Sequence, residues 1–168
     1  ILLAAITAIT SALLDNVTTV LLMVPVTIAV TQKLKVDPIP YLFAEIISSN
    51  IGGTATLVGD PPNIIIGGAT SLGFMDFIYN LTPAVLVMLP VVIMIMVFVY
   101  RSSLKTRDEY KQSIMEMDES VAIKDYPMLC KCLGVLGLTI IGFLLHQSLN
   151  LESATIALGG AVLLMLLV

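Results

Sequence analysis

The sequence predicts an all-α polytopic membrane protein, and its composition and apolar stretches carry that prediction. Of its 168 residues, 58% are hydrophobic and only 12% are charged, and the mean hydropathy is +1.03. A soluble domain is typically about 45–50% apolar and about 25% charged. Several uncharged stretches are also long enough to enter or cross a bilayer. This pattern excludes a soluble globular enzyme and a disordered tail.

Charge and cysteine content exclude further classes. Eight basic residues against twelve acidic ones give a net charge of −4, so no basic patch exists for a nucleic-acid partner. Cys130 and Cys132 are too few for a disulfide scaffold and too close for a structural zinc site. We expect no cofactor and no resident metal. Because Ile1 and Val168 lie inside apolar runs, we also expect a piece of a longer protein, cut within helices.

Residues 1–30 are expected to form a re-entrant hairpin. Two apolar arms flank Asp15-Asn16. A single helix would be ~45 Å long, whereas the hydrocarbon core is about 30 Å thick. It would also hold Asp15 near the bilayer centre, at a cost of at least ~2.5 kcal/mol. Two arms of ~21 Å each, with Asp15-Asn16 at the tip, avoid this if the tip faces protein or a wet cavity.

Residues 41–69 are expected to form one discontinuous helix after a polar loop at 31–40. Glycines and the run Gly59-Asp60-Pro61-Pro62-Asn63 break the apolar pattern around 52–63, because proline removes a backbone donor and disfavours helix before it. Glu45, four residues past Tyr41, is more consistent with an interfacial position than with a site.

The rest of the chain alternates between apolar spans and connections. Residues 81–100 contain no charge and form the clearest span. The expected elements are a short loop at 70–80, a span at 81–100, a polar loop at 101–127, a span at 128–145, a short loop at 146–152 and a truncated span at 153–168.

Basic residues predict the orientation. All eight Lys and Arg residues lie in 31–40 or 101–131, and the loops at 70–80 and 146–152 hold none. The positive-inside rule therefore places the loops 31–40 and 101–127 in the cytoplasm. The hairpin then enters from the cytoplasmic side and turns back.

Two polar clusters occur where lipid disfavours them, and they supply the candidate site. Breaks in membrane helices free backbone groups that, with hydroxyl, amide and carboxylate side chains, can replace an ion's hydration shell. A carboxylate in a poorly hydrated cavity can also load and release a proton. The candidate substrate- or ion-binding residues are Asp15, Asn16, Thr18, Asn50, Gly52, Gly53, Thr54, Thr56, Asp60 and Asn63, and a sodium ion would use Asp15, Asn16, Gly53 and Asp60.

Structural and other functional interpretations of these clusters are also possible alternatives to a transport site. The glycines alone could serve close helix packing. A phosphate-binding loop at 52–59 is excluded, because no Gly-Lys-Ser/Thr sequence follows. An intramembrane enzyme would need a nucleophile with a base or metal ligands at membrane depth, and no histidine lies there, so we expect no enzyme. A non-transporting membrane scaffold remains an alternative.

The two clusters resemble one family. The segment SALLDNVTT at 11–19, followed by MVPVT at 23–27, resembles the arsenite permease and P-protein branch of the ion transporter superfamily. The segment NIGGTAT at 50–56, followed by GDPPN at 59–63, resembles the second signature of that branch. KCLGVLG at 131–137 resembles the P-protein segment after the long cytoplasmic loop.

The resemblance implies a fold, a location and a function. It implies one half of an inverted-repeat transporter with an elevator-like motion, in a bacterial or archaeal inner membrane, and a homodimer. The implied function is secondary active transport of an inorganic ion, arsenite- or anion-permease-like and proton-coupled or potential-driven. A sodium/proton antiporter and a citrate or dicarboxylate carrier are the alternatives. Related carboxylate carriers have Ser-Asn-Thr and Gly-Thr-Pro-Pro-Asn where this chain has Asp15-Asn16-Val17 and Gly59-Asp60-Pro61-Pro62-Asn63, which disfavours a carboxylate substrate and sodium-coupled import.

Overall fold

The structure is a computed structural model that describes residues 1–70, 72–101, 103–104, 125–149 and 151–167. Within these residues the secondary structure is helical, with no strand. The chain divides into two compact units, Ile1–Leu72 with Asp76–Met117, and Gly73–Met75 with Asp118–Val168.

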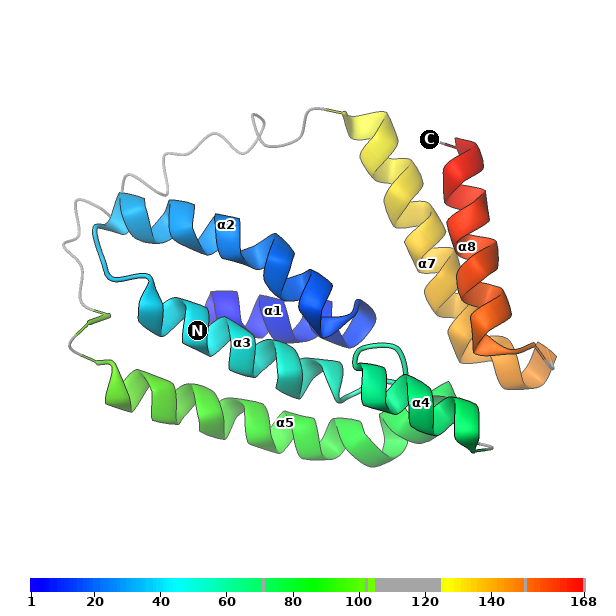
Figure 1. The fold of residues 1–168 in the computed structure, drawn as a ribbon, viewed down its shortest axis with the longest axis horizontal. Coiled ribbons are helices and arrows are strands. Elements are labelled where there is room, and N and C mark those ends of the chain that lie inside the picture. The colour runs from blue at the N-terminus through cyan, green and yellow to red at the C-terminus, as the bar shows by residue number, and fades with distance from the viewer. Residues whose placement is uncertain (71, 102, 105–124, 150, 168) are drawn as a thin grey trace. The chain divides into compact units, whose positions relative to one another are not determined.

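The first unit contains four helices and most of a fifth (Figure 1). These are α1 (Leu2–Leu13), α2 (Asn16–Leu34), α3 (Ile39–Gly53), α4 (Pro61–Ala69) and α5 (Phe74–Val99). In Figure 1, α3 runs between α2 and α5.

A break at Leu14 and Asp15 separates α1 from α2. Leu14 is extended, and the Asp15 side chain caps α2 by accepting hydrogen bonds from the backbone N–H groups of Val17 and Thr18. Such a cap satisfies donors that have no partner inside the helix. The helix α2 continues to Leu34, beyond the arm expected to end at residue 30. Its C-terminal cap, Lys35, has a left-handed backbone with φ of 52°, so the connection to α3 is shorter than the expected loop.

A second break, at residues 54–60, separates α3 from α4. Pro61 and Pro62 occupy the first turn of α4, where a missing N–H costs nothing because that donor has no helical partner. The break is narrower than the 52–63 predicted from composition, since Gly52 and Gly53 still belong to α3. The discontinuity follows from the proline pair, and the glycines serve close packing instead.

The helices α1, α2 and α3 pack against one another. A Cβ added at Gly52 would lie 2.1 Å from the carbonyl oxygen of Ala8, so α1 and α3 approach to backbone contact. Small residues permit such approach between membrane helices. The buried polar side chains of the described residues concentrate here; on α1, α2 and α3 they are Thr7, Ser11, Thr19, Thr27, Thr31, Glu45, Ser48 and Ser49.

The helix α5 begins before the span predicted at 81–100. It starts at Phe74 and carries Asp76 in its first turn, where a carboxylate is favoured by the helix dipole. The region expected to be a loop at 70–80 is therefore largely helical. Pro83 and Pro90 lie inside α5, and the hydroxyl of Thr82 donates to the carbonyl of Ala55 at 3.2 Å, which ties α5 to the second break.

The second unit is built on α7 (Tyr126–Leu149) and α8 (Ser153–Leu167), which pack together. A Cβ added at Gly142 would lie 2.7 Å from a methyl carbon of Ile156, so these helices also use glycine for close contact. Lys131 donates from Nζ to the carbonyl of Leu167 at 2.7 Å and thereby satisfies an acceptor at the end of α8. Most of the polar loop predicted at 101–127 lies outside the described residues.

In the part of the chain that the structure describes, three helical segments are long and apolar enough to cross a membrane. They are Asn16–Leu34, Phe74–Val99 and Tyr126–Leu145. Large apolar side chains on α5 are left exposed by the protein, among them Leu86 and Phe98, as lipid contact requires. The chain is thus consistent with a polytopic membrane protein. The re-entrant path of α1 and α2, the inverted repeat and the sidedness of the loops stay predictions.

Candidate functional site

The two helix breaks lie against each other in the first unit. The backbone N–H of Asn16 donates to the carbonyl of Gly59 at 3.2 Å. The hydroxyl of Ser49 donates to the carbonyl of Asn16 at 2.9 Å. Both main-chain groups of Asn16 are therefore bound to the discontinuous helix, and the start of α2 is fixed beside the end of α3.

Asn16 also joins the breaks through its side chain. Its Nδ2 donates to Oδ1 of Asn50 at 3.1 Å and to Oδ1 of Asp60 at 3.0 Å. The remaining oxygen, Oδ1 of Asn16, is buried without a partner among the described residues. We call Asn16, Asn50 and Asp60 the amide–carboxylate cluster. Its free oxygens offer the oxygen-rich surroundings that a small cation or a hydroxylated neutral acid requires.

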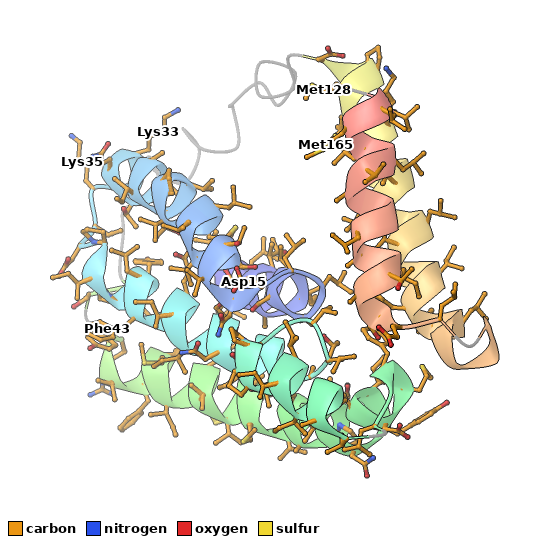
Figure 2. All side chains as sticks on the ribbon, turned by 45° about the vertical axis from the view of Figure 1, so that its right-hand side comes forward. Asp15, Lys33, Lys35, Phe43, Met128 and Met165 are labelled. Carbon is orange, nitrogen blue, oxygen red and sulfur yellow. The ribbon has the colours of Figure 1, made fainter. Side chains whose placement is uncertain are left out.

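Asp15 lies next to this cluster but bonds to its own helix. Its carboxylate accepts from the N–H of Val17 at 3.2 Å and of Thr18 at 2.9 Å, and the Thr18 hydroxyl donates to it as well. Figure 2 shows Asp15 at the end of α2 nearest α1, with Lys33 and Lys35 at the opposite end of α2. The charge of Asp15 therefore acts on the first turn of α2, and Thr18 serves the same cap.

Three of the candidate residues shape the second break. Asn63 is buried and donates from Nδ2 to the carbonyls of Thr54 at 3.1 Å and Thr56 at 2.9 Å. The Thr56 hydroxyl donates to the carbonyl of Ala12 at 2.6 Å and accepts from the N–H of Gly59 at 3.2 Å. The Thr54 hydroxyl donates back to the carbonyl of Asn50. These side chains satisfy backbone groups that the break releases, so they hold the loop rather than offer free ligands.

Close backbone approach explains the glycines. A Cβ at Gly53 would lie 2.4 Å from the carbonyl oxygen of Gly59, and a Cβ at Gly59 would lie 2.6 Å from the carbonyl oxygen of Ser11. The Ser11 hydroxyl donates to the carbonyl of Ser49 at 2.7 Å. A side chain at Gly53 would force open the second break itself, and one at Gly59 would also push that break away from α1. Gly52 acts in the same way against α1, and none of the three offers a side-chain ligand.

The electrostatics of the site come from helix ends. The amino ends of α2 and α4 begin at Asn16 and Pro61, and both carry partial positive charge. Asp15 and Asp60 are the residues that precede these helices, so each carboxylate is stabilised by a dipole. Within α1 to α4 the only side chain of Lys, Arg or His is that of Lys33, at the far end of α2. The cluster and the neighbouring Asp15 therefore contribute two acids, Asp60 and Asp15, and no basic side chain of α1 to α4 lies beside them.

Sequence reasoning missed several residues that build the site. Ser49 bridges both breaks but occurs in an apolar run that gave it no separate signal, and Thr82 lies in α5. Glu45, expected at the interface, is 0% exposed, and the Thr27 hydroxyl donates to its carboxyl. Glu45 lies three and four residues before Ser48 and Ser49, on the same face of the helix, and this spacing could have indicated that Glu45 is buried.

Comparisons with known proteins bear on the whole chain. The citrate transporter family CitMHS matches residues 1–168. An uncharacterized transporter of Mycobacterium tuberculosis is 44% identical over 98% of this chain and 38% of its own length. The magnetosome protein MamN of Magnetospirillum gryphiswaldense is 33% identical over 85% of this chain and 33% of its own length. The human P protein is 58% identical over 66 residues, which are 39% of this chain and 8% of its own length.

The matched relatives are longer than this chain, which spans about two fifths of the length of the mycobacterial transporter. Their match confirms the resemblance found in the two polar clusters, including that to P protein. The chain belongs to the citrate transporter family CitMHS, within the ion transporter superfamily.

Proposed function

We propose that this chain forms part of a secondary active transporter that binds a small inorganic ion or its neutral acid where the two helix breaks meet. The observation that carries the proposal is the bridge from Asn16 to both Asn50 and Asp60. It joins the two helix breaks and leaves Oδ1 of Asn16 buried without a partner among the described residues. Sites of this kind, with half-helix ends around a midplane ligand, are typical of secondary transporters.

The charges of the cluster favour some substrates over others. Asp60 of the cluster and the neighbouring Asp15 have no basic side chain of α1 to α4 beside them, so they suit a cation, a proton or an uncharged acid and repel a tricarboxylate. We therefore place an arsenite-like neutral acid first, exported with proton coupling or by the membrane potential. Citrate would need basic groups beside the junction, and α1 to α4 bring none there, so the family's description alone does not make it the substrate here.

A sodium/proton antiporter is the second candidate function. The presence of two acids at the junction favours it, since Asp15 and Asp60 each precede a helix that begins there. Two acids that alternately hold sodium and protons would explain why neither has a basic partner. The cluster would then bind the transported ion itself.

Efflux assays on the full-length protein separate these candidates. Cells that express it are loaded with arsenite, and inverted vesicles are tested for sodium-driven proton movement and for citrate uptake. The first candidate predicts arsenite export that Asp60→Asn, a change within the cluster, abolishes, while Asp37→Asn, an exposed acid outside the junction, exports normally. Sodium-dependent proton movement without arsenite export would move the antiporter to first place. Transport that Asp60→Asn leaves intact would refute the role of the junction.

A further inference from the structure

A second carboxyl group is buried outside the cluster. Glu45 lies on α3, and its side chain is 0% exposed. The hydroxyl of Thr27, on α2, donates to Oε1 of Glu45. The other oxygen, Oε2, is buried without a partner among the described residues. Glu45 precedes Ser49 by four residues, about 6 Å along the helix axis, and it takes no part in the hydrogen bonds that join the amide–carboxylate cluster.

The surroundings of Glu45 do not suit an ionised carboxylate. A buried charge needs a counter-ion or several donors, and this carboxyl receives one hydroxyl. In Figure 1, α5 also runs beside α3, and its ionisable side chains are Asp76 and Tyr79. The helices packed most extensively against α3 are α1 and α2. The first carries no ionisable side chain, and the second carries only Lys33, which is exposed. On α3 itself the other ionisable side chain is Tyr41. An uncharged carboxylic acid, which both donates and accepts, fits this interface.

A structural role does not require an acid at this position. Neighbouring buried polar side chains such as Thr31 and Ser48 are hydroxyls, and Thr31 satisfies its own hydroxyl by donating to the carbonyl of Thr27. A hydroxyl or an amide in place of Glu45 would bind α2 equally well. A carboxyl adds one property, which is that it can release a proton when water reaches it.

Further unpartnered oxygens lie along the same interface. Oγ1 of Thr19, on α2, is buried without a partner among the described residues, as is Oδ1 of Asn16. Along α2, Thr19 lies between Asn16 of the cluster and Thr27, which contacts Glu45. Transient water on these acceptors would give a proton a route when the two helices separate.

We propose that Glu45 is a proton-binding site of this transporter, separate from the amide–carboxylate cluster and occluded between α2 and α3. The acid holds its proton while Thr27 covers it, and it exchanges that proton when α2 moves away from α3. Proton binding at Glu45 is independent of the substrate, whereas its use in coupling rests on the proposed function.

Infrared difference spectroscopy on the purified full-length protein in lipid tests the binding, and it requires no substrate. The wild type at neutral pH is expected to show a protonated-carboxyl stretch that Glu45→Gln lacks and Glu152→Gln retains. Glu152 is an exposed residue outside this interface and serves as the matched control. The amide in Glu45→Gln can still accept from Thr27, so the fold should persist, and gel filtration checks this.

Two further spectroscopic measurements test whether Glu45 binds the proton. Thr27→Val removes the hydroxyl that donates to the carboxyl and should shift the Glu45 band, even if Glu45→Gln fails to fold. Alkaline titration should remove the band reversibly. An identical band in wild type and Glu45→Gln, or no shift in Thr27→Val, would overturn the proposal, and so would a band that persists throughout alkaline titration. A failed arsenite or sodium assay would leave these spectra unchanged, so the two proposals fail separately.

Discussion

Replacing Asn16 tests the junction of the two breaks, because its side chain binds both Asn50 and Asp60. Asn16→Ala removes the 3.1 Å bond to Asn50 and the 3.0 Å bond to Asp60. A neutral hydrogen bond contributes about 0.5–1.5 kcal/mol, and one to a charged group about 1.5–3 kcal/mol. The backbone bonds of Asn16 to Gly59 and Ser49 survive the change. The free energy of unfolding should therefore fall by about 2–4 kcal/mol.

Reversible unfolding of the full-length protein in mixed detergent micelles, followed by circular dichroism, measures this loss. Asn80→Ala is the matched control, since the exposed Asn80 side chain donates only within its own helix, to the carbonyl of Asp76. That control should lose less than about 1 kcal/mol. An Asn16→Ala variant within about 0.5 kcal/mol of the control, which is the scatter of ordinary surface substitutions, would refute the bridge.

Other substitutions probe the packing and the second break. Gly52→Ala places a methyl group against the backbone of Ala8 and should lower the free energy of unfolding by about 1–3 kcal/mol or more in the same assay. Gly68→Ala, with open space around it, is the control and should be neutral or stabilising by up to about 1 kcal/mol. Equal effects of the two substitutions would contradict the close approach of α1 and α3. Asn63→Ala removes two bonds to break carbonyls and should lower unfolding free energy by about 1–3 kcal/mol, with increased proteolysis between residues 54 and 60; unchanged cleavage would count against its role.

Local chemistry made both breaks predictable. Asp15-Asn16 after an apolar run predicts a helix start, and Pro61-Pro62 predicts a helix that cannot continue backward. The clustering of polar groups at these points also indicated that they belong to one site. The family resemblance rested on the same residues, since the chemistry that breaks the helices is the chemistry that defines the signatures.

Contacts between distant segments were not predictable in the same way. A sequence shows that Asn16 and Asp60 are polar, but only the packing of α1, α2 and α3 shows that Asn16 donates to Asp60. Glu45 illustrates the limit most clearly: distance from a helix start suggested an interfacial position, whereas burial depends on which neighbour covers the carboxyl. Two helix boundaries differ from the expected ones for a similar reason. Lys33 and Asp76 are polar and suggested loops, but they lie in the last turn of α2 and the first turn of α5, where the helix dipole favours their charges.

The central claim is that the amide–carboxylate cluster binds the transported or coupled ion. Its most direct test compares vesicles of wild type, Asp60→Asn and Asp37→Asn in the arsenite, sodium/proton and citrate assays. Loss of a charged ligand worth about 1.5–3 kcal/mol should weaken transport by about 10–100-fold in Asp60→Asn, while Asp37→Asn remains at the wild-type rate. Wild-type transport by Asp60→Asn, in whichever assay the parent is active, would contradict the account.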